Sequence, residues 1–216
     1  MQELEPLLQR KTTVIYQSAP SLKSVPRNID ARHFDVTMIG HLRDEKDPAT
    51  FMRAAKLLAS PHVRLIHIGT ALDPLLGAEA EATQREHARY RWLRNVPHAR
   101  TRQLLKRSQL MVITSRMEGG ANVIIEAVTS GVPVLASDMS GNRGMLGQDY
   151  AGYFPVGDSH ALACMIDRAA TDASFYRRLQ SQCASRASLF SPQREKAAVL
   201  QLVDNLVNPT SPPTGQ

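Results

Sequence analysis

The sequence predicts an α/β fold built on a parallel sheet whose two faces are both covered by helices. Short runs rich in β-branched residues alternate along the chain with longer stretches whose apolar residues recur at helical spacing. Several of the short runs are apolar at consecutive positions, as expected of strands that are buried on both faces. The 216 residues, of which 43% are hydrophobic, suit one domain with appendages.

Six expected strands account for the sheet. Each is a short apolar or β-branched run, and together they cover residues 13–16, 36–40, 63–69, 90–93, 109–114 and 132–137. Helices are expected between these strands and after them, over residues 48–59, 73–88, 100–107, 122–129, 158–170, 174–188 and 193–206. Pro48 suits the first turn of its helix, where a missing N–H costs nothing. Asp158 and Ser191 are expected to cap the helices that follow them.

The chain is expected to divide into three unequal parts. Residues 1–30 include a polar stretch with two prolines, 18–26, which is typical of a linker that arrives from an upstream domain. Residues 31–207 carry the main part of the predicted sheet and all the predicted helices. The tail, residues 208–216, is too polar to bury itself and is expected to be disordered.

Composition and motif content exclude several function classes. The formal charge of +6 favours anionic ligands, but the one dense basic cluster, residues 100–107, has apolar residues at helical spacing and is expected to be a solvated helix face, so no nucleic-acid partner is expected. No apolar run approaches the roughly 18 residues of a membrane span. The acidic, polar N-terminus is not that of a signal peptide. The two cysteines, Cys164 and Cys183, lack zinc-binding spacing and are expected to be reduced thiols in the core of a cytoplasmic protein.

Several catalytic fingerprints do not occur in the sequence. The motifs HExxH, GxSxG, GxxxxGK(S/T) and GxGxxG are all absent. They mark metalloproteases, serine hydrolases, P-loop proteins and dinucleotide-binding folds, so none of these standard classes is predicted.

A loop with two glycines is the most informative local feature. Gly119 and Gly120 stand between the end of a predicted strand and a helix expected to begin near Asn122. In an open α/β sheet, ligands bind beyond the carboxyl ends of the strands. Glycines permit a close backbone approach and unusual dihedral angles. The free N–H groups of the following helix N-terminus make this loop an expected anion site.

Two carboxylates flank the expected anion site. Glu118 lies directly before the glycines, and Glu126 lies about one turn inside the helix. Because a carboxylate can accept hydrogen bonds from two vicinal hydroxyls, the pair predicts a ligand with hydroxyl groups on both sides of a phosphate. A nucleotide-sugar has this arrangement.

This segment resembles the C-terminal, donor-binding domain of the GT-B glycosyltransferases of the retaining group 1 or family-4 class. Their hallmark is Glu-Gly-x6-Glu-Ala followed by Gly-x-Pro-Val-x-Ala, and both parts occur here between Glu118 and Ser137. The resemblance extends from about Val14 to Leu206. It implies a Rossmann-like, doubly wound sheet with extra C-terminal helices, and a transferase that takes a hexose unit from a UDP-sugar.

The resemblance also implies a role for each residue of the motif. Glu118 would contact hydroxyls of the donor sugar, and Glu126 would hold the ribose hydroxyls of the nucleotide. The backbone groups that contact the diphosphate and the sugar would belong to Gly119, Gly120, Ala121, Asn122 and Val123. Members of the family need neither a metal ion nor another cofactor, which agrees with the absence of an Asp-x-Asp motif.

A second family motif, Gly-Arg-Leu-x3-Lys, corresponds to the stretch from Gly40 to Lys46. Lys46 would supply a cation for the diphosphate and so take part in catalysis. His41 stands where the family has arginine, and it is either a packing residue or a ligand contact. Arg43, two residues later, could supply the charge that His41 does not.

A third segment follows a middle strand, where the family pairs its backbone with the uracil edge. Trp92 and Leu93 occupy that place, and the family's glycine after the strand is replaced by Arg94. Trp92 is the only tryptophan, and core packing is the alternative to a place beside the base.

Three stretches are similar to a narrower subgroup, the selenosugar synthases. They are residues 40–48, 115–122 and 141–147. This similarity implies a UDP-N-acetylhexosamine donor, selenophosphate as the small-molecule acceptor, and a carbon–selenium bond in the product. The residues that would face the acceptor are Ser140, Asn142, Arg143 and Arg116.

GT-B enzymes have two Rossmann-like domains, and the acceptor and a catalytic histidine usually belong to the N-terminal one. This chain has room for the second domain only, so the N-terminal domain is expected to be missing and turnover to be slight. Two alternatives stay open. One is a catalytically silent module that binds a UDP-sugar, and the other is a GT-B-fold UDP-N-acetylhexosamine epimerase, whose donor site lacks the Glu-Gly-Gly-Ala-Asn loop.

Overall fold

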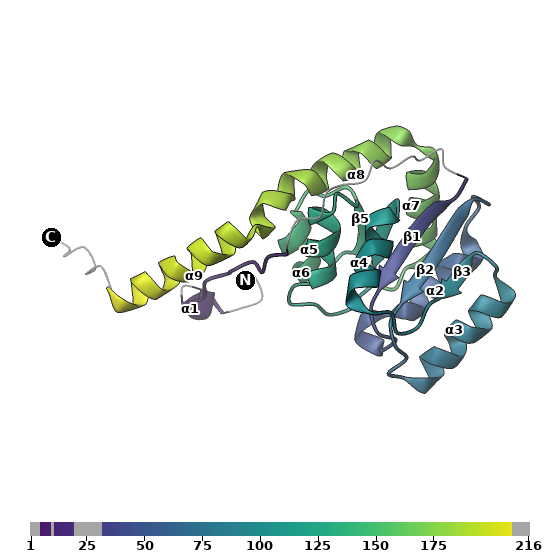
Figure 1. The fold of residues 1–216 in the computed structure, drawn as a ribbon, viewed down its shortest axis with the longest axis horizontal. Helices are drawn as coiled ribbons and strands as arrows, with labels where there is room; N and C mark the ends of the chain where they lie inside the picture. Colours follow the sequence, from purple (N-terminus) through teal and green to yellow (C-terminus); the bar gives the residue numbers. More distant parts are fainter. Residues whose placement is uncertain (1–4, 10, 20–31, 209–216) are drawn as a thin grey trace.

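A six-stranded parallel sheet forms the centre of the computed structural model, which describes residues 5–9, 11–19 and 32–208 (Figure 1). The strands are β1 (Phe34–Ile39), β2 (Val63–Ile68), β3 (Tyr90–Trp92), β4 (Leu110–Ile113), β5 (Val134–Ser137) and β6 (Tyr153–Phe154). Their order across the sheet is β3-β2-β1-β4-β5-β6, and each pairs in parallel with its neighbours. The chain winds outward from β1 in one direction and from β4 in the other, which is the predicted doubly wound, Rossmann-like topology.

Helices cover both faces of this sheet. The helical elements are α1 (Pro6–Gln9), η1 (Asp44–Lys46), α2 (Pro48–Leu57), α3 (Pro74–Glu86), α4 (His98–Arg107), α5 (Asn122–Thr129), α6 (Ser140–Leu146), α7 (Ser159–Thr171), α8 (Ala173–Arg186), η2 (Ala187–Phe190) and α9 (Pro192–Val207). Because crossovers between parallel strands are right-handed, α2 and α3 lie on one face and α5 and α6 on the other. Strands β4 and β5 are buried at every position, as the apolar runs predicted.

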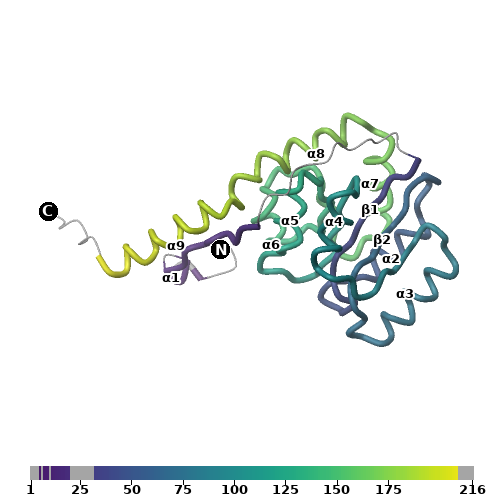
Figure 2. Tube along the Cα trace, in the orientation of Figure 1, coloured from purple at the N-terminus to yellow at the C-terminus, as the bar shows by residue number. Residues whose placement is uncertain are grey.

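The last helix, α9, extends beyond the body of the domain. Figure 2 shows α8 running along the edge of the domain and α9 continuing beyond it, with the described part of the N-terminal segment beside α9. None of the residues of α9 is buried, and Val203, Leu206 and Val207 are exposed. Among the described residues, no helix is both long enough and apolar enough to span a membrane.

The predicted strand at residues 13–16 is wrong. Within the described residues 11–19 the backbone joins no sheet. The Tyr16 ring packs edge-on against Phe190 at 5.7 Å, and its hydroxyl donates to the Gly144 carbonyl at 3.0 Å. Tyr16 therefore contacts η2 and α6 instead of pairing with a strand, and Val14 is exposed.

Strand β6 and helix α6 were not predicted. Strand β6 has only two residues, aligned with Ala136 and Ser137 of β5, and so short a run carries no periodic signal. Helix α6 contains Gly141 and Gly144, which lower helix propensity. The predicted linker is described only in part, and the predicted disordered tail lies outside the described residues except for Asn208. Of the two cysteines that were expected in the core, Cys183 is buried but Cys164 is exposed.

Side-chain caps lie at the start of α2, α7 and α9. Asp47 adopts a left-handed conformation (φ 44°) and accepts a hydrogen bond from the Thr50 amide, so that Pro48 occupies the first turn of α2. Asp158 and Ser191 accept from backbone amides at the start of α7 and α9. These contacts confirm the predicted caps and the predicted place of Pro48.

His67 is fully buried within the sheet and links it to the loop after β1. Its Nδ1 lies 2.8 Å from the Tyr90 hydroxyl, and its Nε2 lies 3.3 Å from the Gly40 carbonyl. Because a carbonyl can only accept, Nε2 carries the proton and Nδ1 accepts from Tyr90. Burial lowers the pKa of His67 to about 4, against the weaker opposing effect of the Gly40 carbonyl.

The stability of the protein should therefore depend on the protonation of His67. In the unfolded chain the imidazole takes up a proton near pH 6.5, whereas in the folded protein it resists protonation until its pKa of about 4. The contribution is complete above pH 6.5 and is lost as the pH falls through this window, by on the order of 3 kcal/mol. Urea unfolding of the wild type and of His67→Gln at pH 7 and pH 4.5 measures it. Equal pH slopes for the two proteins would contradict the prediction.

Candidate functional site

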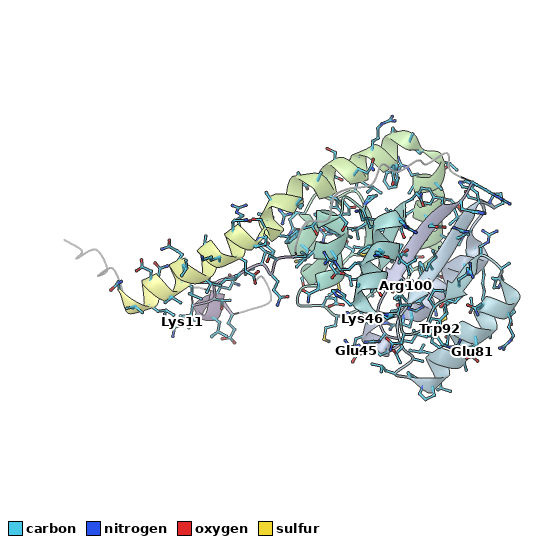
Figure 3. The ribbon with its side chains drawn as sticks, viewed as in Figure 1. Lys11, Glu45, Lys46, Glu81, Trp92 and Arg100 are labelled. Atoms are coloured by element: carbon cyan, nitrogen blue, oxygen red, sulfur yellow. The ribbon has the colours of Figure 1, made fainter. Side chains whose placement is uncertain are left out.

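Two loops, residues 40–47 and 114–121, meet at the carboxyl ends of β1 and β4, where the strand order reverses. Three contacts hold these loops together. The Thr114 hydroxyl donates to the Lys46 carbonyl at 2.7 Å, and the Arg116 amide donates to the Glu45 carbonyl at 2.8 Å. The Arg116 guanidinium also lies 3.4 Å from the carboxylate of Asp47, which is buried. Figure 3 labels Lys46 and Glu45 at this end of the sheet.

An ion pair joins the two loops at their centre. Lys46 Nζ donates to Glu118 Oε1, and the Ser115 hydroxyl donates to the same oxygen at 2.9 Å. The two charged side chains are only 20% and 11% exposed. The structure thus brings together the two residues that the separate motifs single out, and it pairs their charges.

Helix α6 packs directly behind Glu118. A Cβ atom at Gly141 would lie 2.0 Å from the Glu118 carbonyl oxygen, so only glycine permits this approach. The Ser137 hydroxyl donates to the Ser115 carbonyl at 2.6 Å, and Asn142 Nδ2 donates to the Ser137 carbonyl at 2.8 Å. The expectation that Asn142 faces an acceptor is wrong, because its side chain is fully buried and supports this loop.

The double glycine does not adopt left-handed backbone angles. Neither Gly119 nor Gly120 has a positive φ, so neither uses the left-handed conformation that glycine permits. A Cβ atom at Gly119 would meet nothing within 4 Å, and one at Gly120 would meet only the Met145 sulfur, at 3.9 Å. The packing of the described chain does not require glycine here. The loop leaves open space in front of Asn122, the first residue of α5, whose N-cap Ala121 makes no side-chain cap.

A cleft of about 1010 Å³ opens beside the glycines. Its walls are formed by residues 14–17, residues 118–120 and helix α6. Arg143 and Ser140, for which contact with an acceptor was predicted, line this cleft, but Arg143 is already paired with Asp138 through contacts of 2.5 and 2.7 Å. A bound anion would have to compete with that carboxylate for Arg143.

Glu126 lies in the second turn of α5, and its carboxylate faces helix α4. His98 Nε2 lies 2.8 Å from Glu126 Oε1, and Arg102 Nε lies 3.9 Å from the same atom. The Glu126 side chain is 14% exposed. Sequence reasoning missed Arg102 because it interpreted residues 100–107 as a solvated helix face, and it assigned no role to His98.

The loop after β1 has a tight packing partner in the loop after β2. A Cβ atom at Gly69 would lie 1.9 Å from the Gly40 carbonyl oxygen. His41 is exposed, and its Nδ1 accepts from the Thr70 amide at 3.1 Å, so its ring is held at the rim of the site. Arg43 is half exposed and lies 3.8 Å from Glu45.

The segment that was expected to contact the base begins at Trp92, the last residue of β3. Trp92 is buried and donates from Nε1 to the Gly69 carbonyl at 2.8 Å, which favours the core-packing alternative. The backbone amides of Trp92 and Leu93 donate to Gln84 and to the His67 carbonyl. Neither amide is therefore available to a ligand. Arg94 adopts a left-handed conformation (φ 55°), the backbone geometry that a glycine would adopt more easily.

No described group of three or more His, Cys, Asp or Glu side chains is arranged to hold a metal ion. The polar groups of the site include Lys46, the carboxylates of Glu118 and Glu126, and His98 of α4.

Comparison with known proteins gives this site a family context. The glycosyltransferase 1 domain-containing protein 1 of Xenopus tropicalis is 32% identical over 125 residues, which are 56% of this chain and 35% of that protein. TarM of S. aureus, in complex with UDP among other ligands, has a TM-score of 0.74 at 17% identity over 90% of this chain and 41% of its own. HepE of Anabaena, in complex with UDP and glucose, has a TM-score of 0.67 at 24% identity over 82% of this chain and 49% of its own.

These relatives are longer than the chain, which spans about a third of the curated relative and less than half of either solved structure. The structural likenesses, at less than 25% identity, establish the fold. The sequence evidence goes further, because the family model of the glycosyl transferases group 1 matches residues 23–186, about three quarters of the chain. By this match the chain belongs to the group 1 glycosyltransferases.

Proposed function

We propose that this chain is the donor-binding domain of a metal-independent glycosyltransferase that takes a sugar from a UDP-sugar. The observation that carries the proposal is the Lys46–Glu118 pair at the switch point of the sheet, beside the open cleft at the start of α5. UDP is the proposed nucleotide because HepE and TarM, which share the fold, were both solved with it.

Each polar group of the site then has a distinct task. The diphosphate lies at the N-terminus of α5, where free amides and the positive end of the helix dipole favour an anion. Lys46 leaves Glu118 to pair with the diphosphate. Glu118 accepts hydrogen bonds from the sugar, and Glu126 accepts hydrogen bonds from the ribose.

The proposed reaction places its developing charge in front of Lys46. The acceptor attacks the anomeric carbon, the bond from this carbon to the phosphate oxygen breaks, and the electron pair leaves with UDP. Lys46 and the α5 amides stabilise that charge without a metal ion, because they are already oriented before the bond breaks. The second domain of a GT-B enzyme would close over the cleft and exclude water.

We further propose a UDP-N-acetylhexosamine donor and selenophosphate as the acceptor. The support is the similarity of residues 40–48, 115–122 and 141–147 to selenosugar synthases. Of the expected acceptor residues, Arg116 is half exposed, whereas Arg143 is paired with Asp138. Release of UDP by the enzyme extended upstream, in the presence of UDP-N-acetylglucosamine and selenophosphate, tests this step. Equal release with inorganic phosphate or with no acceptor would overturn it.

The test of the donor site is calorimetric titration of this chain with UDP, UDP-N-acetylglucosamine and ADP. We expect UDP to bind more tightly than ADP, and Glu126→Ala to weaken UDP binding by roughly 10- to 100-fold, because hydrogen bonds to a charged group contribute about 1.5–3 kcal/mol. Glu86→Ala is the matched control, since Glu86 is an exposed helical glutamate away from the site. Equal loss in both variants, or no preference for UDP, would count against the proposal. Binding of the donor by an upstream-extended enzyme that transfers nothing would support a silent module instead.

A further inference from the structure

Helix α4 contributes a polar contact to the site from His98, which is not one of the buried residues through which the helix packs. The buried residues of α4 are Thr101 and Leu105. His98, at the start of the helix, is 73% exposed and contacts the carboxylate of Glu126, which is 14% exposed. An exposed ring thus holds a nearly buried carboxylate of another helix.

The protonation of this contact follows from its geometry. Glu126 Oε1 lies 2.8 Å from His98 Nε2, and a carboxylate without its proton can only accept. Nε2 therefore carries the proton and donates to Oε1. Arg102 Nε, at 3.9 Å from the same oxygen, adds positive charge on the same side of the carboxylate.

We propose that His98 is a positioning residue for ribose recognition, an inference that rests on the proposed function of Glu126. The last torsion of a glutamate side chain has no sharp rotamer, so an unheld carboxylate rotates freely. The hydrogen bond from His98 fixes Oε1 and with it the plane of the carboxylate. The second oxygen, Oε2, is then oriented before the ribose hydroxyls arrive, and the ligand does not have to order it.

The local fold places His98 where this task requires it. Pro97 precedes the helix with an extended backbone (φ −54°, ψ 141°), and His98 is the first residue of α4. The loop that ends at Pro97 follows the carboxyl end of β3. Helix α4 thus begins at the edge of the sheet where α5 also begins, and His98 reaches Glu126 from there.

The experiment compares UDP with 2′,3′-dideoxyuridine diphosphate, which lacks the ribose hydroxyls, by calorimetric titration of the 216-residue chain. The wild type is expected to prefer UDP. In His98→Ala this preference should fall by roughly 2- to 10-fold, the range of a single hydrogen bond. The affinity for the dideoxy ligand should stay the same. His98→Gln keeps an N–H donor and should restore part of the preference.

Arg100→Ala is the matched control. Arg100 is an exposed cation two residues along the same helix (Figure 3). It lines a separate pocket together with Gln103 and Arg107. Arg100→Ala changes the net charge of the protein at least as much as His98→Ala does. It should nevertheless leave the preference for UDP unchanged. Circular dichroism of each variant checks that the exposed substitutions leave the fold intact.

The outcomes separate the inference from the proposed function. A wild type that binds UDP with preference, together with a His98→Ala variant of equal preference, overturns the positioning role alone. Equal losses for both ligands in His98→Ala also overturn it, because they indicate a general effect of charge. A wild type that binds both ligands equally overturns the assignment of Glu126 to the ribose, and the inference with it.

Discussion

Replacing Lys46 with Met is expected to weaken the binding of UDP by roughly 10- to 100-fold, because a charge-assisted hydrogen bond contributes about 1.5–3 kcal/mol. The loss has a second cause in the structure. Lys46 is paired with Glu118 in the structure. Without the ammonium group, the Glu118 carboxylate stands uncompensated beside the diphosphate and repels it.

The opposite change in the affinity for UDP is expected when Glu118, the partner of Lys46, is replaced. In Glu118→Gln the lysine is no longer held by a carboxylate, so UDP does not have to compete for it, and UDP should bind several-fold more tightly. UDP-N-acetylglucosamine should gain less, because the same substitution removes the proposed contact with the sugar. Titration of both variants with both ligands measures these shifts.

Lys56→Met is the control for the loss of a positive charge, since Lys56 lies exposed on α2. If Lys56→Met and Lys46→Met weaken UDP binding equally, the effect is one of net charge and Lys46 has no contact with the diphosphate. If Glu118→Gln weakens UDP binding, the pair does not compete with the ligand.

Gly141→Ala is expected to destabilise the protein by roughly 1–3 kcal/mol, the usual cost of an overpacked site. The added Cβ atom would lie 2.0 Å from the Glu118 carbonyl oxygen, which is backbone and cannot rotate away. Helix α6 and the Glu118 loop must therefore move apart, so the affinity for the donor should fall together with the free energy of unfolding.

Gly144→Ala is a matched control within the same helix. A Cβ atom at Gly144 would meet nothing within 4 Å, and alanine has the higher helix propensity, so this variant should be as stable as the wild type or more stable, by up to about 1 kcal/mol. Urea unfolding of both variants gives the comparison. Equal free energies of unfolding for the two variants would show that α6 does not press on the Glu118 loop.

Local sequence patterns were sufficient for much of the sheet and for the motif residues. Strands β1 to β5 and helix α5 coincide with apolar runs and periodic stretches, because burial on both faces of a strand leaves its mark on consecutive residues. Glu118 and Glu126 were singled out because they flank the glycine loop at a predicted helix start, and Lys46 because its segment resembles a family motif.

Other features depend on contacts between distant segments. Residues 13–16 have the composition of a strand, but Tyr16 packs against Phe190 and the run joins no sheet. Asn142 was expected to face a ligand, but its amide is buried against Ser137. Strand β6 is defined only by the partner that it meets in β5.

By itself, the sequence determined the fold class, the positions of the central strands and the residues of the glycosyltransferase motifs, because these are written in neighbouring residues. Only the tertiary structure decided that Lys46 pairs with Glu118, that α6 packs against the backbone of Glu118 and that His98 contacts Glu126. Each of these contacts joins residues that are 23 or more positions apart in the sequence. Such contacts exist only after helices and strands have packed together, and no local pattern encodes that packing.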